Sequence, residues 1–329
     1  MRSLLLLLSA VLVGAAPRTA PAVPQVRQHI PLPDGGWDIL TVDSENHRVL
    51  ISRSDGVDAV DTRTGVVTPR FVAGTRFHGV TVVPRTQLAV ATEAAGAAVV
   101  FNRLTGKVIA EVKTDRDADA TLFEPRTRTI WVMNGDSGTI SIVDPAGVKS
   151  VGKISLGSAL EFAATDGRGH VFVNLSDKGE LAEVDVAGRK VMGSIPLAGC
   201  QHSTGLAYVH PGLLISACAN GVAKVTRGGD LKALADIAIG PRPDGAFADD
   251  ARHRAYVTSG GDGTLTVIDT SGPLPRKIAT VQTETGARTG AVDPSTGTVY
   301  SIAAKFGPPP AGGGRPPILP GTVELLVIR

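Results

Sequence analysis

Seven residues that could bind a ligand or a metal ion recur along the chain at intervals of 40 to 44 residues. Four are acids, and each of the seven stands directly before a small or apolar residue that opens a short apolar run. The seven residues are Asp38, His78, Asp119, Glu161, Thr204, Asp244 and Arg288. Carboxylates and imidazole are suitable ligands for Ca²⁺, Mn²⁺ or Zn²⁺. Gathered in one place, this set favours a cation, or a polar ligand that donates many hydrogen bonds.

The chemistry of the seven residues depends on whether they share one cavity. If they do, mutual repulsion raises the pKa of some carboxylates, while Arg288 lowers the pKa of those nearest to it. Three interpretations stay open: a binding site for a small molecule or peptide, a site for a divalent cation, or polar residues that only hydrogen-bond neighbouring loops and channel water.

The elements that must position these residues belong to an internal repeat. A run rich in Val, Ile and Leu returns seven times at spacings of 39 to 44 residues, and turn-forming residues follow the first six runs. The runs begin at Val49, Leu88, Ile130, Val171, Leu213, Ala255 and Val299. A small-residue strand precedes each run, and two further strands follow it, so each unit has four strands. This pattern predicts an all-β fold, a seven-bladed β-propeller of four-stranded blades.

The order of the strands predicts how the ring closes. The small-residue strands should be innermost, where blades crowd near the axis, so the seven residues above meet at the mouth of the central channel. The last unit ends with its third strand at 323–329, and the surplus stretch 25–32 resembles the outer strands of the other units. We therefore expect this N-terminal outer strand to complete the last blade and leave no open edge. The expected blades within a single domain, 23–329, are 37–74, 75–115, 116–158, 159–199, 200–240, 241–283 and 284–329 plus 25–32.

The N-terminus predicts the compartment. Arg2 is followed by a short apolar run, and small residues follow at 14–16 and at Ala20 and Ala22. This layout is typical of a secretory signal peptide, expected over residues 1–22, with cleavage after Ala15 or Ala22. A buried N-terminal element is the alternative. We expect a periplasmic or secreted protein with no membrane span in the mature chain.

Charge argues against nucleic-acid binding. The formal charge of +2 includes Arg2 and Arg18, so the mature chain is close to neutral, and only 4% of the residues are aromatic. Nucleic-acid-binding proteins usually have a basic face and aromatic residues that stack on bases. No nucleic acid is therefore expected as a partner.

The two cysteines, Cys200 and Cys218, fall on connections at the same face of the fifth unit. An even number of cysteines in an exported protein favours a disulfide, and two free thiols are the alternative. The sequence has no Cys-x-x-Cys-His motif for haem attachment, which disfavours a redox-partner propeller. It also has no Gly-x-Ser-x-Gly or His-Glu-x-x-His motif.

Two further features lie near the expected channel mouth. A Pro- and Gly-rich insertion at 305–321 replaces a tight turn in the seventh unit, and it is either a surface loop or a lid over the channel, with Phe306 as the residue that docks. Arg76, Arg116 and Arg242 lie two or three residues before three of the seven residues. We expect these arginines to form surface ion pairs; the alternative is that they line the rim for an anionic ligand.

Several segments resemble a known family at the expected repeat positions. They are Trp37 to Asp43, Phe77 to Val80, Glu161 to Ala163, Gly286 to Thr289 and Phe306 to Pro310. On these residues the chain, from 25 to 329, resembles the secreted YVTN-repeat (YncE-like) propellers. The resemblance implies the seven-bladed fold, and the relatives of this family include lactonase-like propellers and cofactor-dependent dehydrogenase subunits. The chain departs from the family at 200–205, where relatives often have a pair of acids and a proline after the cysteine.

The function predicted from these observations is that of an exported, non-catalytic propeller that binds at its channel mouth. The expected partner is a small molecule or peptide, or an envelope protein. No cofactor is indicated with certainty, and a divalent cation at the central ring is the one candidate. The alternative is a metal-assisted, lactonase-like hydrolase in which ring acids hold the metal and His78 or Glu161 acts as the base.

Overall fold

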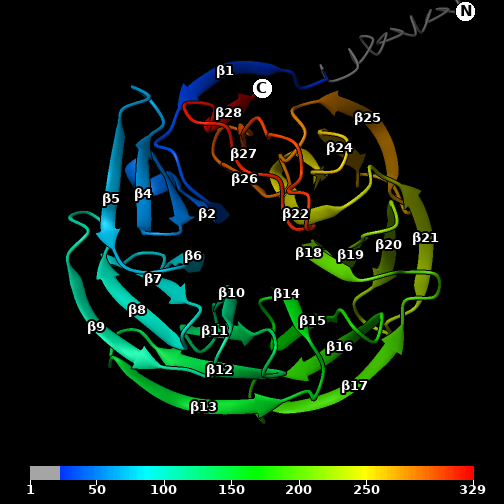
Figure 1. Ribbon diagram of the computed structural model, residues 1–329. Coiled ribbons are helices and arrows are strands. Elements are labelled where there is room, and N and C mark those ends of the chain that lie inside the picture. Colours follow the sequence, from blue (N-terminus) through cyan, green and yellow to red (C-terminus); the bar gives the residue numbers. More distant parts are fainter. Residues whose placement is uncertain (1–22) are drawn as a thin grey trace, which may run out of the picture.

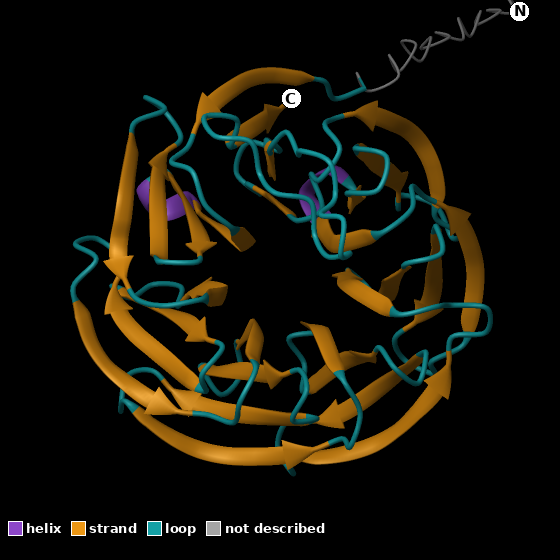
Figure 2. Cartoon of the chain, in the orientation of Figure 1, coloured by secondary structure: helices purple, strands orange, loops and turns teal. Residues whose placement is uncertain are grey.

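The computed structural model describes residues 23–329, which form seven antiparallel sheets of four strands each around a central opening (Figure 1). The predicted seven-bladed β-propeller is confirmed. The signal peptide expected over 1–22 lies outside the described residues. Apart from strands and loops, residues 23–329 contain two short 3₁₀ helices, η1 (Ser44–Asn46) and η2 (Asp250–Arg252), and Figure 2 marks the helical segments in purple. Within residues 23–329, no helix has the length and apolar character needed to cross a bilayer.

The innermost strand of each blade lines the central opening (Figure 1). The innermost strands are β2 (Trp37–Asp43), β6 (Phe77–Val82), β10 (Ala118–Glu124), β14 (Leu160–Thr165), β18 (Ser203–Val209), β22 (Pro243–Asp249) and β26 (Gly290–Val292). The second strands contain the apolar runs of the repeat. They are β3 (Arg48–Arg53), β7 (Leu88–Glu93), β11 (Thr129–Asn134), β15 (His170–Leu175), β19 (Leu213–Cys218), β23 (Arg254–Ser259) and β27 (Val299–Ala303).

The third strands follow the hairpin turns. They are β4 (Gly56–Asp61), β8 (Ala97–Asn102), β12 (Thr139–Asp144), β16 (Glu180–Asp185), β20 (Val222–Arg227), β24 (Thr264–Asp269) and β28 (Glu324–Ile328). The outer strands form the perimeter in Figure 1. They are β5 (Val67–Ala73), β9 (Val108–Lys113), β13 (Lys149–Ser155), β17 (Lys190–Pro196), β21 (Ala233–Ala238), β25 (Arg276–Gln282) and β1 (Val26–Pro31).

The hydrophobic core lies between the faces of adjacent blades. All six residues of β11 are buried, and Trp131 on this strand belongs to the same apolar cluster as Val171 and Val173 on β15 of the next blade. A strand covered by neighbours on both faces needs a continuous apolar run rather than alternation. This explains why the second strands produce the strongest repeat in the sequence.

Ring closure occurs in the seventh blade, where the strand order is β1-β28-β27-β26. The N-terminal strand β1 pairs antiparallel with β28, from Val26 opposite Ile328 to Pro31 opposite Glu324. The expected N-terminal outer strand is confirmed. The segment that then crosses to the first blade is held by the buried guanidinium of Arg53, which donates to the carbonyls of Pro33 and Gly36.

Candidate ligand site at the channel mouth

Bulges in the inner strands aim the ring residues at the channel. In the third blade, Ala118 pairs with Asn134 and Thr121 with Val132, so β10 has one residue more than β11 across this interval. Asp119 lies in that bulge. The same register shift occurs at the corresponding position in the first six inner strands. A bulge bends a strand and redirects its side chains, which places a polar group at the axis without breaking the apolar face of the blade.

Small residues beside the ring let neighbouring inner strands approach closely. A Cβ atom on Gly79 would lie 2.5 Å from the backbone oxygen of Asp119, and a Cβ on Gly205 would lie 2.5 Å from the backbone nitrogen of Ala246. The amide of Gly245 donates a hydrogen bond to the carbonyl of Arg288 across the blade boundary, over 2.9 Å. The glycines therefore bring the ring side chains of successive blades within reach of one another.

Six of the seven predicted residues surround one cavity of about 290 Å³: Asp38, His78, Asp119, Glu161, Asp244 and Arg288. We call this set the inner ring and its space the ring cavity. The seventh residue, Thr204, lines a wider cavity of about 700 Å³ that shares Asp244 and Arg288 with the ring cavity, and we call this space the mouth cavity. The hydroxyl of Thr204 donates to the carbonyl of Pro243 over 3.0 Å. Its role in the structure is to join two blades.

Asp38 connects the two basic members of the inner ring. Its Oδ2 lies 2.7 Å from Nδ1 of His78, and its Oδ1 accepts a hydrogen bond of 3.3 Å from Arg288. Arg288 also donates from Nε to Asp244 over 2.8 Å, and Nδ1 of His78 lies 3.6 Å from Asp119. The side chains of these five residues are between 22% and 32% exposed, so they face the channel rather than the blade interior.

Burial makes three ring acids unusually weak. Burial first, and then repulsion from Asp119 and other ring acids, raise the pKa of Glu161 to about 9. Burial, reinforced by Asp38, raises the pKa of Asp119 to about 8. Burial also raises the pKa of Asp244, but only to about 6, because Arg288 acts against it. The predicted direction is correct, with burial rather than repulsion as the leading cause, and at neutral pH Glu161 and Asp119 hold protons.

The histidine of the ring shifts in the same direction. The hydrogen bond from His78 to Asp38 raises the pKa of His78, and the charges of Asp38 and Asp119 add to this effect. These contributions outweigh burial, which lowers the pKa. His78 is therefore more basic than an ordinary histidine, while its Nε2 atom is buried and has no hydrogen-bond partner among residues 23–329.

A divalent cation fits one part of the ring by its donor set. Asp38, His78 and Asp119 each offer one ligand atom, and these atoms lie within 4.8 Å of one another. Two carboxylates and an imidazole are donors that suit Mn²⁺ or Zn²⁺. A second group of this kind, His29, Glu284 and Glu324, includes residues of the outer two strands of the seventh blade, β1 and β28.

Two of the three arginines predicted to form surface pairs line the cavities instead. Arg76 lines the ring cavity and Arg242 the mouth cavity, and neither side chain has a hydrogen bond or ion pair within residues 23–329. The surface-pairing expectation is therefore wrong for these two arginines in the described part of the chain. Arg116 lines neither cavity, and the next residue, Asp117, lines the ring cavity.

The insertion at 305–321 forms a wall of the mouth cavity and lies on the side of blade seven toward the central opening (Figure 1). Phe306 pairs with Ile318 as an isolated antiparallel bridge. The ring of Phe306 lies 6.4 Å from that of Trp37 and packs so closely on Gly286 that a side chain there would collide with it. Whether this segment opens and closes as a lid stays a prediction.

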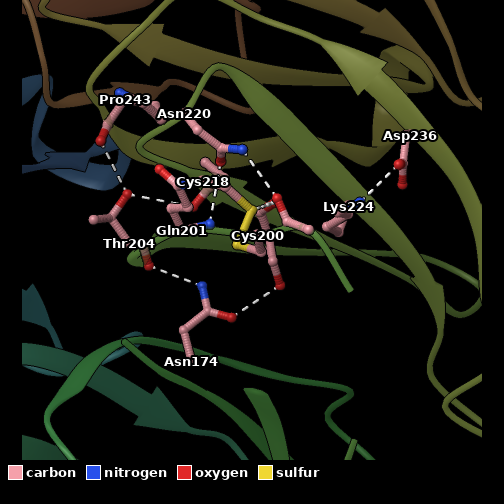
Figure 3. Close-up of a disulfide and its surroundings, with 12 residues drawn as sticks. Asn174, Cys200, Gln201, Thr204, Cys218, Asn220, Lys224, Asp236 and Pro243 are labelled. Atoms are coloured by element: carbon pink, nitrogen blue, oxygen red, sulfur yellow. Dashed lines mark hydrogen bonds and ion pairs between the residues drawn. A yellow bond between two sulfur atoms is a disulfide. The ribbon is translucent and has the colours of Figure 1, made fainter. Parts of the chain in front are cut away.

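The two cysteines form the predicted pair (Figure 3). Cys200 precedes β18 and Cys218 ends β19, and their Cα atoms are 5.3 Å apart across the disulfide. Beside the disulfide, the Asn220 side chain donates to the carbonyl of Gly199 over 2.9 Å and accepts from the amide of Gln201 over 3.1 Å. The loop that leads into the fifth inner strand is thus fixed close to Thr204.

Sequence reasoning missed two charged residues of the site. Asp117 occupies the position that Arg76 and Arg242 occupy in their repeats, two residues before the ring position, so the repeat alignment that found those arginines could have found it. Arg315 lies in the insertion and lines both cavities. No repeat position corresponds to Arg315, and only the folded path of the loop brings it to the ring.

Comparisons with known proteins support the fold and leave the ligand open. No family model matches the chain, and no curated protein matches it. Among solved structures, the chain is similar to a chain of hydrazine synthase from Kuenenia stuttgartiensis, with 16% sequence identity and a TM-score of 0.70. The match covers 83% of this chain and 94% of that one. At this identity the likeness shows a shared fold alone.

Proposed function

We propose that this protein is an exported ligand-binding propeller whose ring cavity receives a cationic or hydrogen-bond-donating group of a small molecule. One observation carries the proposal: Glu161 faces the cavity and has no side-chain hydrogen bond or ion pair within residues 23–329. Glu161 is half-buried, and a carboxyl group held partly away from bulk water gains from a hydrogen-bond partner. A ligand that donates to Glu161 supplies such a partner, and the same group can reach Asp119, which has His78 as its neighbour at 3.6 Å.

The setting of the cavity supports this proposal. The inner ring is built on rigid strands. Because its side chains are already held in place, little free energy of binding is lost in ordering them. The disulfide between Cys200 and Cys218 is consistent with export, since such bonds persist in oxidising compartments. The segments that resemble the YncE-like family support membership of that secreted family. A peptide side chain, or an exposed residue of an envelope protein, could present the same donor group.

A metal-assisted hydrolase of the lactonase kind is the second candidate. The clustering of the Asp38, His78 and Asp119 ligand atoms within 4.8 Å favours it. A bound divalent ion would polarise a lactone carbonyl as a Lewis acid. Glu161 would then serve as the general base once its proton has been lost, and Arg288 would keep Asp38 and Asp244 in place.

Native mass spectrometry of protein purified without chelator tests the proposal. We expect the wild-type chain to retain a small molecule that dissociates on activation, and we expect Glu161→Gln to retain much less of it. Glu111→Gln is the matched control, because Glu111 is an exposed acid on the outer strand β9, outside both cavities. Equal retention by wild type and Glu161→Gln would place the ligand elsewhere and refute the proposal.

The same experiment separates the two candidates. A retained divalent ion in stoichiometric amount, lost in Asp119→Asn together with hydrolysis of a lactone substrate, would establish the hydrolase. An organic ligand with no metal and no lactone turnover would support the binding protein.

A further inference from the structure

The mouth cavity is lined by Asp244 of the inner ring and by two arginines that form no ion pair within residues 23–329. Arg242 and Arg315 line the mouth cavity, and Arg315 also reaches the ring cavity. Within residues 23–329 neither guanidinium forms an ion pair or a side-chain hydrogen bond, whereas Arg288 of the inner ring pairs with both Asp38 and Asp244. The positive charge of Arg288 is thus already balanced by Asp38 and Asp244, whereas the charges of Arg242 and Arg315 are available to a ligand.

The two arginines reach this place from separate parts of the chain. Arg242 directly precedes β22 of the sixth blade, and Arg315 is contributed by the insertion of the seventh blade. Arginine presents a planar fork of donors that matches a carboxylate or phosphate group. Two such forks at one opening are better explained by the binding of a single anionic group than by two separate arginines that only face solvent.

Apolar side chains line the mouth cavity beside the two arginines. Trp37, Phe306, Pro316 and Ile318 line the same mouth cavity. Binding sites commonly place an apolar wall around a few polar groups that fix the orientation of the ligand. An aliphatic or aromatic stem between a cationic end and an anionic end would pack on these side chains.

From this arrangement we propose that the mouth cavity and the adjoining ring cavity together bind a zwitterionic small molecule, with its carboxylate on Arg242 and Arg315 and its ammonium group on the ring acids. An ω-amino acid or the terminal part of a short peptide has this chemistry. The inference rests on the proposed binding function and adds the anionic end of the ligand to it. It also gives the insertion a specific role, because Arg315 is one of the two arginines that would bind the carboxylate.

Isothermal titration calorimetry with matched probes tests the inference. The probes are ω-amino acids of four, six and eight carbons, and, for the one that binds best, the primary amine and the carboxylic acid of the same chain length. We expect the amino acid to bind at least about tenfold more tightly than the amine, because charge-assisted hydrogen bonds are the strong ones. The carboxylic acid alone should bind more weakly than either.

Variants locate the two ends of the ligand. The double variant R242Q/R315Q should weaken the amino acid about tenfold or more and leave the amine unchanged, while Glu161→Gln should weaken both. Arg116→Gln is the control, because Arg116 lies three residues before its ring residue, Asp119, and lines neither cavity. Circular dichroism confirms that each variant is folded.

Two results would overturn the inference, and they differ in what else they affect. Equal affinity for amine and amino acid, with no effect of R242Q/R315Q, would remove the anion site and leave the proposed binding function standing. Failure of every amine and amino acid to bind would remove both the inference and the cationic-donor form of the proposed function.

Discussion

At the scale of single residues, two half-buried carboxyl groups in the channel hold protons at neutral pH. Glu161 and Asp119 have pKa values of about 9 and 8, so both are neutral at pH 7, while His78 is shifted toward its charged form. A neutral carboxyl group can donate a hydrogen bond as well as accept one. The inner ring can therefore offer a ligand both hydrogen-bond donors and hydrogen-bond acceptors at the same depth in the channel.

The raised pKa of Glu161 predicts how stability depends on pH. The folded chain holds this proton up to about pH 9, whereas the unfolded chain releases it near the ordinary value of 4.5. Between these values the folded state binds more protons, so its stability falls as pH rises, by up to about 1.4 kcal/mol per pH unit for this group. Glu161→Gln should remove that part of the decline, measured by urea denaturation from pH 5 to pH 8. Parallel pH profiles for wild type and Glu161→Gln would contradict the prediction, and Glu111→Gln should follow the wild type.

The hydrogen bond between His78 and Asp38 predicts a second titration result. Asp38→Asn removes the largest contribution to the raised pKa of His78, so this pKa should fall. Asp117→Asn is the control, because Asp117 makes the smallest of the contributions. An NMR titration of the His78 imidazole measures both variants. A larger fall in Asp117→Asn than in Asp38→Asn would show that the hydrogen bond is not the main cause.

The sequence predicted most of the inner ring because the ring residues follow the repeat. Glu161 and Asp244 could be placed by counting along equivalent strands. Arg315 could not, because it belongs to an insertion with no counterpart in other blades. The ion-pairing of Arg76 and Arg242 was predicted wrongly, since the sequence does not show how far a side chain lies from the acids of neighbouring blades.

At the scale of elements, a bulge forms each of the first six ring positions, and a Gly or Ala follows the ring residue in four of them. Gly79 follows His78 and lies against the backbone of the next inner strand. The apolar runs of the second strands were visible in the sequence, whereas the bulges were not, because an extra residue in one strand is defined only by the register with its partner.

The close approach at Gly79 predicts a cost for adding a single methyl group. Gly79→Ala would place a Cβ atom 2.5 Å from the Asp119 carbonyl oxygen, so the second and third blades must separate. We expect a loss of about 1–3 kcal/mol in the free energy of unfolding. Gly229→Ala is the control, because nothing lies within 4 Å of the added atom there, and its effect should stay within about 0.5 kcal/mol. Equal urea midpoints for the two variants would refute this account.

The disulfide of the fifth blade gives another prediction at this scale. It closes a loop with a sequence separation of 18 residues. The double variant C200S/C218S should lose about 3 kcal/mol of stability through the greater freedom of its unfolded chain. Thermal denaturation without reductant measures the loss, and wild type in reductant should match the variant. An unchanged midpoint would mean that the pair contributes nothing to stability.

At the scale of the whole molecule, the outer strands share one feature. Nearly every outer strand has a single buried aliphatic residue, one position before its end. These residues are Ile30, Val72, Val112, Ile154, Ile237 and Val281. Because β1 has the same pattern as the outer strands of the other blades, it fits the seventh blade although it comes from the opposite end of the chain. The sequence contained enough information to predict this closure.

The shared pattern predicts a difference between two matched variants. Ile30 and Ile237 are both 6% exposed on outer strands, so Ile30→Ala and Ile237→Ala should each cost about 2–5 kcal/mol. Only Ile30→Ala weakens the strand that closes the ring. Hydrogen exchange should therefore show faster exchange of the β28 amides in Ile30→Ala and not in Ile237→Ala. Equal protection of β28 in both variants would argue against closure by β1.

The pairing of β1 with β28 has a consequence for the order of assembly. Val26 finds its partner Ile328 only after almost the whole described chain has been laid down between them. Contacts between residues so distant in sequence form late, because bringing them together costs chain entropy that the other blades do not incur. Six blades can assemble from neighbouring segments while β1 stays unpaired. We therefore expect the ring to close, and its cavity to be fully walled, only at the last step of folding.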